Sequence, residues 1–352
     1  MTLRPTISVI ITNYNYEEYV GHAIESVLSQ TRLPDEIIVI DDGSTDSSPD
    51  IIRSYGDRVR AVLQSNEGIR SVTSTGYAIS TGQIVMYLDA DDLLYPAAVE
   101  RVEKAFGPGI AKVQFDLDVI DGNGRRLGRR MPDFSGGGLS ETELAREFSQ
   151  TGTYRWPVTS GNAYSRNFLS QVMPVDPPVS LDGVLNTISP LYGGIITISD
   201  PQGQYRVHQR NNSRKNTGGT IAFIPNFASR IGYRKQEFNV LREHAARLGR
   251  VLPNGDFLDN ELVFVNYRIM ARKLSLEDGG DHNRSLLDLW IKGMIAIGRG
   301  HFRPGATLKH AIWICSVTLL PAPLAQRLIA IRFLRTHWFS NLRSLLVRST
   351  RL

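Results

Sequence analysis

The sequence predicts an α/β protein in which a mostly parallel sheet, flanked by helices, is followed by a C-terminal helical region. Apolar runs rich in β-branched residues alternate with helical patterns in the first half of the chain, and only helical patterns follow residue 220. The 352 residues are 41% hydrophobic and 21% charged, which supplies enough apolar material for a large core. This composition excludes the disordered, collagen-like and disulfide-rich classes of protein.

Strand and helix patterns alternate from the start of the chain. Four apolar runs are expected to be strands, at residues 7–12, 36–40, 59–63 and 84–88. Helical spacing of apolar residues predicts the helices between them, at residues 17–30, 47–55 and 69–80. Because each strand is followed by a helix, these strands are expected to lie parallel, with helices covering both faces of the sheet.

Composition changes mark the later boundaries of the chain. Stretches rich in Gly, Ser and Asn at residues 133–138 and 211–219 are expected to be loops, and the second is expected to close the sheet domain. Clear helical patterns then cover residues 227–248 and 257–276. The predicted organisation therefore has three parts: a sheet domain over residues 1–215, a helical extension over 216–284, and a basic amphipathic tail over 285–352.

Charge is unevenly distributed along the chain. The net charge is +5, but residues 285–352 hold ten Lys or Arg and a single acid, Asp288, so the tail carries +9 and the rest of the chain −4. Two interpretations of the tail stay open: helices lying in the interface of an anionic membrane, or a helical subdomain packed on the sheet domain with a solvated basic face. Nucleic acid is not expected as a partner, because no binding motif accompanies the charge.

Neither end of the chain predicts a membrane span or export. The longest uncharged run of the tail, residues 310–326, has 17 residues and contains Pro321 and Pro323. A spanning helix needs about 20 apolar residues. The apolar run at residues 7–11 is too short for a signal peptide, and the single cysteine, Cys315, cannot close an intrachain disulfide. We therefore expect a cytoplasmic protein, peripheral at the inner face of the membrane if the tail binds lipid.

Three carboxylates follow the fourth expected strand directly: Asp89, Asp91 and Asp92. Like charges this close raise one another's pKa, so a bound cation is the economical explanation for the cluster. Oxygen ligands select Mg²⁺ or Mn²⁺, which are usually shared with substrate phosphates. The alternative is a solvated acidic loop that caps the next helix.

A second acidic pair, Asp41 and Asp42, follows the second expected strand. One of these carboxylates could accept a hydrogen bond from a nucleobase N–H, although Asp-Gly-Ser is also good turn chemistry. Strand ends of a parallel sheet share one edge, so a base site and a cation site would lie on the same rim. That combination suits a nucleotide-diphosphate ligand. No P-loop or dinucleotide motif follows any of these strands.

These motifs together resemble the family 2 glycosyltransferases, which are inverting enzymes with the Rossmann-like GT-A fold. The resemblance is specific over residues 9–15, 25–31, 36–46, 66–68 and 87–92. It extends more weakly through residues 159–162, Asp182, residues 205–208 and residues 212–213. It implies transfer of a sugar from a nucleotide-diphosphate donor to the hydroxyl of a saccharide or lipid-linked acceptor, in polysaccharide or lipid-linked oligosaccharide synthesis.

The resemblance also implies roles for individual residues. Four would hold the base: Thr12, Tyr14, Asp41 and Asp42. Asp89 would lie near the ribose and the metal, Asp91 would ligate Mn²⁺ or Mg²⁺, and His208 would reach back to the metal or the diphosphate. Asp182 would be the general base. The family pattern has a cationic and an amide side chain where residues 72–74 are Val-Thr-Ser, so Arg70 is a candidate replacement for gripping the donor.

Alternatives stay open at this point. Asp182 could cap a helix, His208 could be a surface or hinge histidine, and Tyr14 could pack over the strand end. A retaining double displacement is not excluded by sequence. A nucleotidyltransferase would also use acidic metal ligands, but its Gly-rich basic phosphate loop is missing at residues 12–15. A degenerate, non-catalytic sugar-nucleotide-binding scaffold is disfavoured because the aspartates at 89, 91 and 182 are all present.

Overall fold

The computed structural model describes residues 4–134, 140–175, 180–208, 227–276, 284–300, 302 and 304–334. The chain divides into two compact units: unit 1 comprises Met1–Asn211 and Gln236–Asn254, and unit 2 comprises Asn212–Lys235 and Gly255–Leu352. This differs from the predicted boundary near residue 216, because residues 236–254 belong to unit 1. The predicted loop at 211–219 and most of the one at 133–138 lie outside the described residues.

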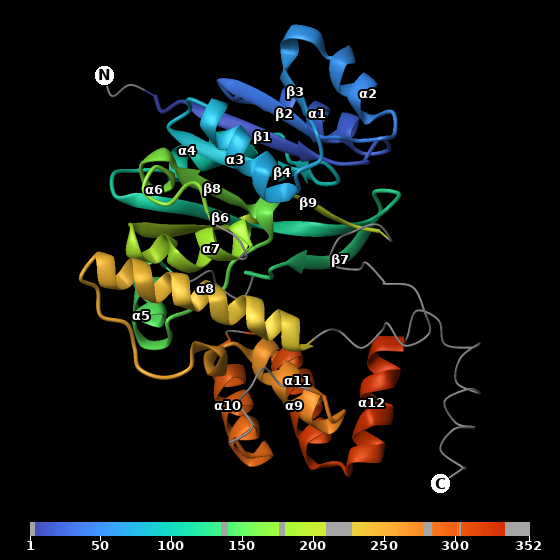
Figure 1. The fold of residues 1–352 in the computed structure, drawn as a ribbon, viewed down its shortest axis with the longest axis vertical. Coiled ribbons are helices and arrows are strands. Elements are labelled where there is room, and N and C mark those ends of the chain that lie inside the picture. Colours follow the sequence, from blue (N-terminus) through green and yellow to red (C-terminus); the bar gives the residue numbers. More distant parts are fainter. Residues whose placement is uncertain are drawn as a thin grey trace. The chain divides into compact units, whose positions relative to one another are not determined.

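The first half of unit 1 has the predicted alternation of strands and helices (Figure 1). Its elements in chain order are β1 (Ile7–Asn13), α1 (Val20–Leu28), β2 (Glu36–Asp42), α2 (Ser48–Ser54), β3 (Arg60–Gln64), α3 (Ile69–Ile79) and β4 (Ile84–Asp89). The four strands pair in parallel in the order β3-β2-β1-β4. The predicted α/β fold class is therefore confirmed.

Helices cover both faces of this parallel sheet, as the strand pattern requires. Val9 and Ile11 of β1 belong to the core cluster that contains the buried side of α1. Ile10 points to the other face, where α3 packs. A side-chain Cβ on Gly76 of α3 would lie 2.6 Å from Ile10 Cγ2, so the absence of a side chain there lets the helix approach the sheet closely.

The second half of unit 1 makes the sheet mixed. It contributes β5 (Leu93–Leu94), α4 (Ala98–Ala105), β6 (Ile110–Asp121), β7 (Arg126–Met131), α5 (Glu141–Thr151), β8 (Asn162–Ser165), α6 (Arg166–Leu169), α7 (Leu181–Ile188) and β9 (Gly194–Val207). The sheet continues β4-β8-β6-β9-β5, with β7 beside β6. β6 and β9 are parallel, whereas the other pairs in this half are antiparallel. β9 thereby carries its last residues back beside β5, just after the end of β4.

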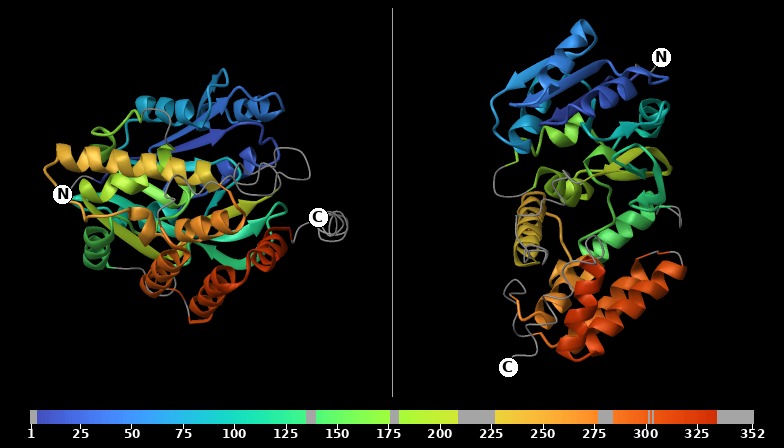
Figure 2. Two further views of the ribbon diagram at one scale, coloured as in Figure 1. Left: turned by 60° about the horizontal axis from the view of Figure 1, so that its bottom comes forward. Right: turned by 90° about the vertical axis from the view of Figure 1, so that its right-hand side faces the viewer.

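Unit 2 is helical in its described part (Figure 2). It contains η5 (Phe257–Asn260), α9 (Leu262–Lys273), α10 (Leu286–Arg299), α11 (Pro304–Leu319), α12 (Ala322–Leu334) and the first residues of α8 (Phe227–Arg247). The prediction of one helix over residues 257–276 is wrong. The backbone is extended at Glu261, with φ −106° and ψ 105°, and this residue pairs with Arg234 instead of continuing the helix from η5 into α9. Among the described residues, no helix is both long and apolar enough to cross a bilayer.

Candidate active site

Polar side chains gather at the carboxyl edge of the parallel strands in unit 1. In the register of the sheet, Asn13 of β1 lies opposite Asp41 of β2, and Thr12 lies opposite Asp89 of β4. Three strands therefore end at the same level. This is the edge at which open α/β sheets bind their ligands, and strand register brings Thr12, Asp41 and Asp89 to it.

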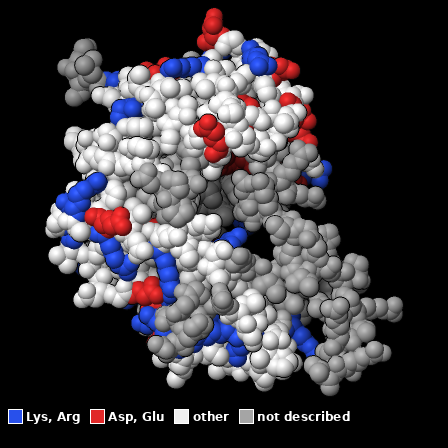
Figure 3. Space-filling view, viewed as in Figure 1, with Lys and Arg blue, Asp and Glu red and all other residues white. Residues whose placement is uncertain are grey.

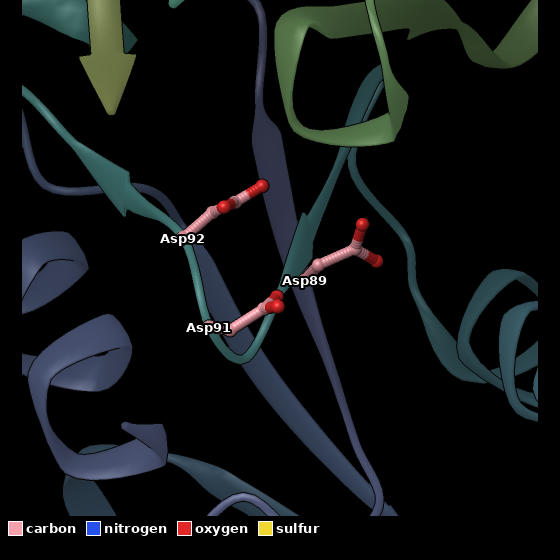
Figure 4. A group of neighbouring side chains, drawn as sticks. All are labelled: Asp89, Asp91 and Asp92. Carbon is pink, nitrogen blue, oxygen red and sulfur yellow. The ribbon is translucent and has the colours of Figure 1, made fainter. Parts of the chain in front are cut away.

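The acidic cluster consists of Asp89, Asp91 and Asp92, at the end of β4 and in the turn that follows it (Figure 4). Each offers a carboxylate oxygen, and these three atoms lie within 4.8 Å of one another. In Figure 4, Asp89 projects from the end of the strand, and Asp91 and Asp92 project from the turn after it. The helix after the turn, α4, has Ala97 at its N-cap, so the acidic cluster does not cap it.

Burial sets the protonation behaviour of the acidic cluster. The pKa of Asp89 is raised to about 7, chiefly by burial and then by the negative charges of Asp91 and Asp182. Burial also raises the pKa of Asp91, and it raises that of Asp92 well above the usual range. A divalent cation among these oxygens would remove the repulsion and favour the charged form of each carboxylate. The donor set is therefore of the kind that Mg²⁺ and Mn²⁺ prefer.

The members of the acidic cluster are held differently. Asp92 accepts hydrogen bonds from Ser160 Oγ at 2.7 Å and from the backbone N–H of Arg206 at 2.8 Å, so its two oxygens tie the turn to neighbouring segments. Asp89 Oδ1 accepts a long hydrogen bond of 3.4 Å from Thr12. Both oxygens of Asp92 thus serve to fix the turn.

His208 lies against the acidic cluster. Its Nε2 is 3.0 Å from Asp91 Oδ2, and only 8% of its side chain is exposed. The imidazole packs against the rings of Tyr16 and Tyr19, with centroids 5.5 and 4.9 Å away. The histidine comes from the residue following β9, so the pairing of β9 with β6 and β5 brings it here. It is not a surface histidine.

The predicted base-binding residues split into two groups. Asp41 and Asp42 are almost fully buried, whereas 42% of Tyr14 is exposed. Asp41 accepts hydrogen bonds from Asn13 Nδ2 at 2.7 Å and from Ser44 Oγ at 2.6 Å, and therefore stabilises the turn after β2. The position of the Arg70 side chain lies outside what the structure describes.

Asp42 anchors the next strand end. Its Oδ1 accepts from Gln64 Nε2 and from the backbone N–H of Glu67, both at 3.0 Å, and its Oδ2 accepts from the N–H of Gly68 at 2.8 Å. Gly68 is the N-cap of α3 and has a φ of +87°, which favours glycine. Asp42 therefore holds the segment that leads into α3 over the edge of the sheet.

Asp182 occupies the first turn of α7, and Ser180 is the N-cap of that helix. The capping role considered for Asp182 therefore belongs to Ser180. Asp182 Oδ1 accepts a hydrogen bond of 2.8 Å from Asn186 Nδ2. Burial, followed by the charge of Glu237, raises its pKa to about 7, against the lowering effect of Lys112. The charge of Asp182 also raises the pKa of Asp89, so the two carboxylates interact electrostatically.

Sequence reasoning assigned no role to two residues that organise this region. Ser160 accepts a hydrogen bond of 3.1 Å from the backbone N–H of Asp89 in addition to bonding Asp92, and it is 1% exposed. The weak motif at residues 159–162 was a usable signal for it. No sequence signal pointed to Asn186, because its importance arises from its position one helical turn after Asp182.

The chain is similar to known glycosyltransferases. The model of glycosyl transferase family 2 matches residues 8–170. An uncharacterised glycosyltransferase of Nostoc sp. is 37% identical over 250 residues, which cover 64% of this chain and 77% of the Nostoc protein. The succinoglycan biosynthesis protein ExoO of Rhizobium meliloti is 33% identical over 145 residues, covering 40% of this chain and 39% of that protein.

A solved structure is also similar over most of the chain. It is a mannosyltransferase of Pyrobaculum calidifontis in complex with GDP-Man and Mn²⁺, with 18% identity, a TM-score of 0.48, and coverage of 94% of this chain and 87% of that one. The family assignment depends on the sequence matches. Since both the family model and a relative aligned over most of its length agree, the chain belongs to glycosyltransferase family 2 and is a glycosyltransferase.

Proposed function

We propose that this glycosyltransferase is metal-dependent and inverting, and that it moves a sugar from a nucleotide-diphosphate donor to an acceptor hydroxyl in polysaccharide or lipid-linked oligosaccharide synthesis. One observation carries the proposal: Asp182, a partly buried carboxylate with a raised pKa, interacts electrostatically with Asp89 of the acidic cluster at the strand ends. An inverting displacement requires these two elements, a base for the acceptor proton and a means of neutralising the leaving diphosphate.

Mn²⁺ or Mg²⁺ would be held by Asp89 and Asp91, with His208 beside Asp91. The bound ion would neutralise charge that develops on the diphosphate as the sugar departs. The chain itself keeps this arrangement in place. Ser160 and the Arg206 backbone fix the turn through Asp92, and the rings of Tyr16 and Tyr19 hold the imidazole of His208.

Asp182 would act as the general base. A pKa of about 7 leaves a substantial deprotonated fraction near neutral pH while keeping the carboxylate basic enough to accept a proton from an attacking hydroxyl. Asn186 occupies Oδ1, which leaves Oδ2 as the oxygen we assign to the acceptor. The hydroxyl oxygen would form the new bond to the anomeric carbon as the bond to the diphosphate breaks, with no covalent sugar–enzyme intermediate.

The nucleoside would bind at the ends of β1 and β2. Tyr14 is exposed enough to stack on a base, and Thr12 lies opposite Asp89 in the register of the sheet. Asp41 and Asp42 are buried and would act mainly through the backbone segments that they hold. They set the shape of the turn and of the segment leading into α3, and Asp42 Oδ2 would accept from a base N–H.

Donor hydrolysis tests this function without knowledge of the acceptor. A panel of nucleotide sugars is incubated with the full chain, with Mn²⁺, with Mg²⁺ and with a chelator. Metal-dependent release of the nucleoside diphosphate, with inverted configuration of the freed sugar by NMR, is the expected result. Retained configuration would overturn the mechanism. Pyrophosphate formed from a nucleoside triphosphate and a sugar phosphate would identify a nucleotidyltransferase, and donor binding without turnover would identify a scaffold.

We also propose that unit 2 docks reversibly on an anionic membrane surface. Its helices expose large apolar side chains in rows: Leu287, Ile291 and Ile295 on α10, and Leu308, Ile312 and Leu319 on α11. No Asp or Glu follows Asp288 in the sequence, whereas ten Lys or Arg do. Blue basic side chains and uncharged surface lie together over the helices of unit 2 (Figure 3). Apolar rows bordered by cations suit the interface of an anionic bilayer.

A further inference from the structure

A lysine is buried in the core of unit 1, in strand β6. Lys112 has no exposed surface, and its Nζ donates to Gln114 Oε1 at 2.9 Å, to the hydroxyl of Tyr154 at 3.1 Å and, at closer range, to Asn186 Oδ1. Desolvation lowers its pKa well below the usual value, and the charge of Asp182 opposes this lowering. A buried lysine without a carboxylate in its hydrogen-bond shell is expensive to maintain and calls for an explanation.

The hydrogen-bond pattern favours the charged form of this lysine. The Tyr154 hydroxyl donates its own proton to the backbone oxygen of Asn186 at 2.6 Å, so toward Lys112 it can only accept. Gln114 and Asn186 also present oxygen atoms to Nζ. Three acceptors use all three protons of an ammonium group, and a neutral amine could satisfy only two of them. The local structure is therefore built for a fixed positive charge.

The amide of Asn186 is oriented from its other side. Because the backbone carbonyl oxygen of Asp182 can only accept a hydrogen bond, Nδ2 of Asn186 must face Asp182, which leaves Oδ1 facing Lys112. The amide Nδ2 then faces the opposite way, where it donates to Asp182 Oδ1 and to the backbone oxygen of Asp182, both at 2.8 Å. Lys112, Asn186 and Asp182 thus form a chain of directed hydrogen bonds from the core to the site.

Other titratable groups act on Asp182 from neighbouring elements. Glu237 of α8 lies against the first turn of α7 and raises the pKa of Asp182. Asp89 of β4 and Tyr164 of β8 also interact electrostatically with it. Among these groups, Lys112 is the one whose charge favours the deprotonated carboxylate.

We propose that Lys112 is a positioning residue for the general base: through Asn186 it fixes the orientation of the Asp182 carboxylate and supplies the positive charge that keeps this carboxylate available as a base. The inference rests on the proposed function of Asp182. It assigns Lys112 no contact with the substrate. The same hydrogen-bond chain directs Oδ2, and not Oδ1, toward the acceptor.

The test compares Lys112→Met with a matched control, Lys273→Met. Lys273 is also largely buried, but it lies in unit 2 and donates to the backbone oxygen of Leu320. Donor hydrolysis is followed from pH 5 to pH 9 as kcat/KM. We expect the acid limb of the pH profile of kcat/KM to move upward by about 0.5–1 pH unit in Lys112→Met. This shift is smaller than the one a directly contacting cation would cause, because Asn186 lies between Lys112 and Asp182. The activity of Lys112→Met should approach the wild-type value at the alkaline end, and the limb of the control should stay in place.

A second readout does not depend on turnover. Protein labelled with ¹³C at aspartate carboxyl groups is titrated by NMR, and the Asp182 signal is assigned by its loss in Asp182→Asn. The pKa of Asp182 should rise in Lys112→Met and also in Asn186→Leu, a variant that carries the test if the lysine variant does not fold. An activity loss that is equal at all pH values, with the pKa of Asp182 unchanged, would overturn the proposal. Absence of any donor turnover by the wild-type chain would instead refute the proposed function, and the titration would still decide the coupling.

Discussion

Replacing Ser160 by Ala should destabilise unit 1 more than the loss of an ordinary serine. Ser160 Oγ is buried, donates to Asp92 Oδ2 at 2.7 Å and accepts from the N–H of Asp89 at 3.1 Å. The variant leaves one buried N–H without that acceptor, at about 1–3 kcal/mol. It also removes one buried hydrogen bond to Asp92, typically worth about 1 kcal/mol.

The expected loss is therefore about 2–4 kcal/mol in the free energy of unfolding, measured by urea denaturation at pH 7 without added metal. Ser170→Ala is the matched control, because this exposed serine donates to the backbone oxygen of Asn167 within the same local turn. We expect the control to lose less than about 0.5 kcal/mol. If Ser160→Ala were as stable as the control, Ser160 would not hold the turn of the acidic cluster, and our account of Asp92 as the residue that fixes this turn would be refuted.

Three further predictions concern function. Asp91→Asn should abolish metal-dependent donor hydrolysis while the thermal transition of the protein stays near that of the wild type; near-normal activity would disprove the assignment of Asp91 as a metal ligand. Asp182→Asn should reduce the rate by about 10²–10⁴ with donor binding by calorimetry unchanged. Because the pKa of Asp182 is about 7 and the base acts deprotonated, wild-type kcat/KM should fall as pH drops below 7, and a flat profile in Asp182→Asn should replace this limb. The double variant Ile291→Ser and Ile312→Ser should co-sediment less with anionic vesicles than the wild type or the exposed control Val251→Ser. Added salt should weaken the attachment of the wild type. Equal partitioning of all three proteins would reject membrane docking.

The sequence was most informative where local pattern and tertiary role coincide. The strands ending at Asn13, Asp42 and Asp89 are predicted closely, because buried parallel strands need apolar, β-branched residues and their polar ends mark the ligand edge. The acidic cluster follows from the same reasoning, since its residues are adjacent in the chain. Here the aspartates and the apolar strand pattern that predicts their place lie within a few positions of each other in the sequence.

The parts that sequence did not predict depend on contacts between distant residues. Lys112 lies 74 positions before Asn186, and their hydrogen bond exists because β6 and α7 meet in unit 1. No local pattern marks that contact. The interruption at Glu261 is similar: residues 257–276 have helical spacing, but the backbone is extended at Glu261, whose side chain pairs with Arg234. In both cases a charged side chain finds a partner on another element, and that partner determines its role.

The position of Asp42 links nucleotide occupancy to the order of a backbone segment. Its two oxygens already hold the N–H groups of Glu67 and Gly68, so a base that shares this carboxylate must either leave those bonds intact or compete with them. Binding and segment order are then thermodynamically coupled, and each affects the other by the same free energy. Amide hydrogen exchange at these two positions becomes a direct reporter of the nucleotide: slower exchange on binding means that carboxylate, segment and base form one hydrogen-bonded assembly, and faster exchange means that the base releases the start of α3.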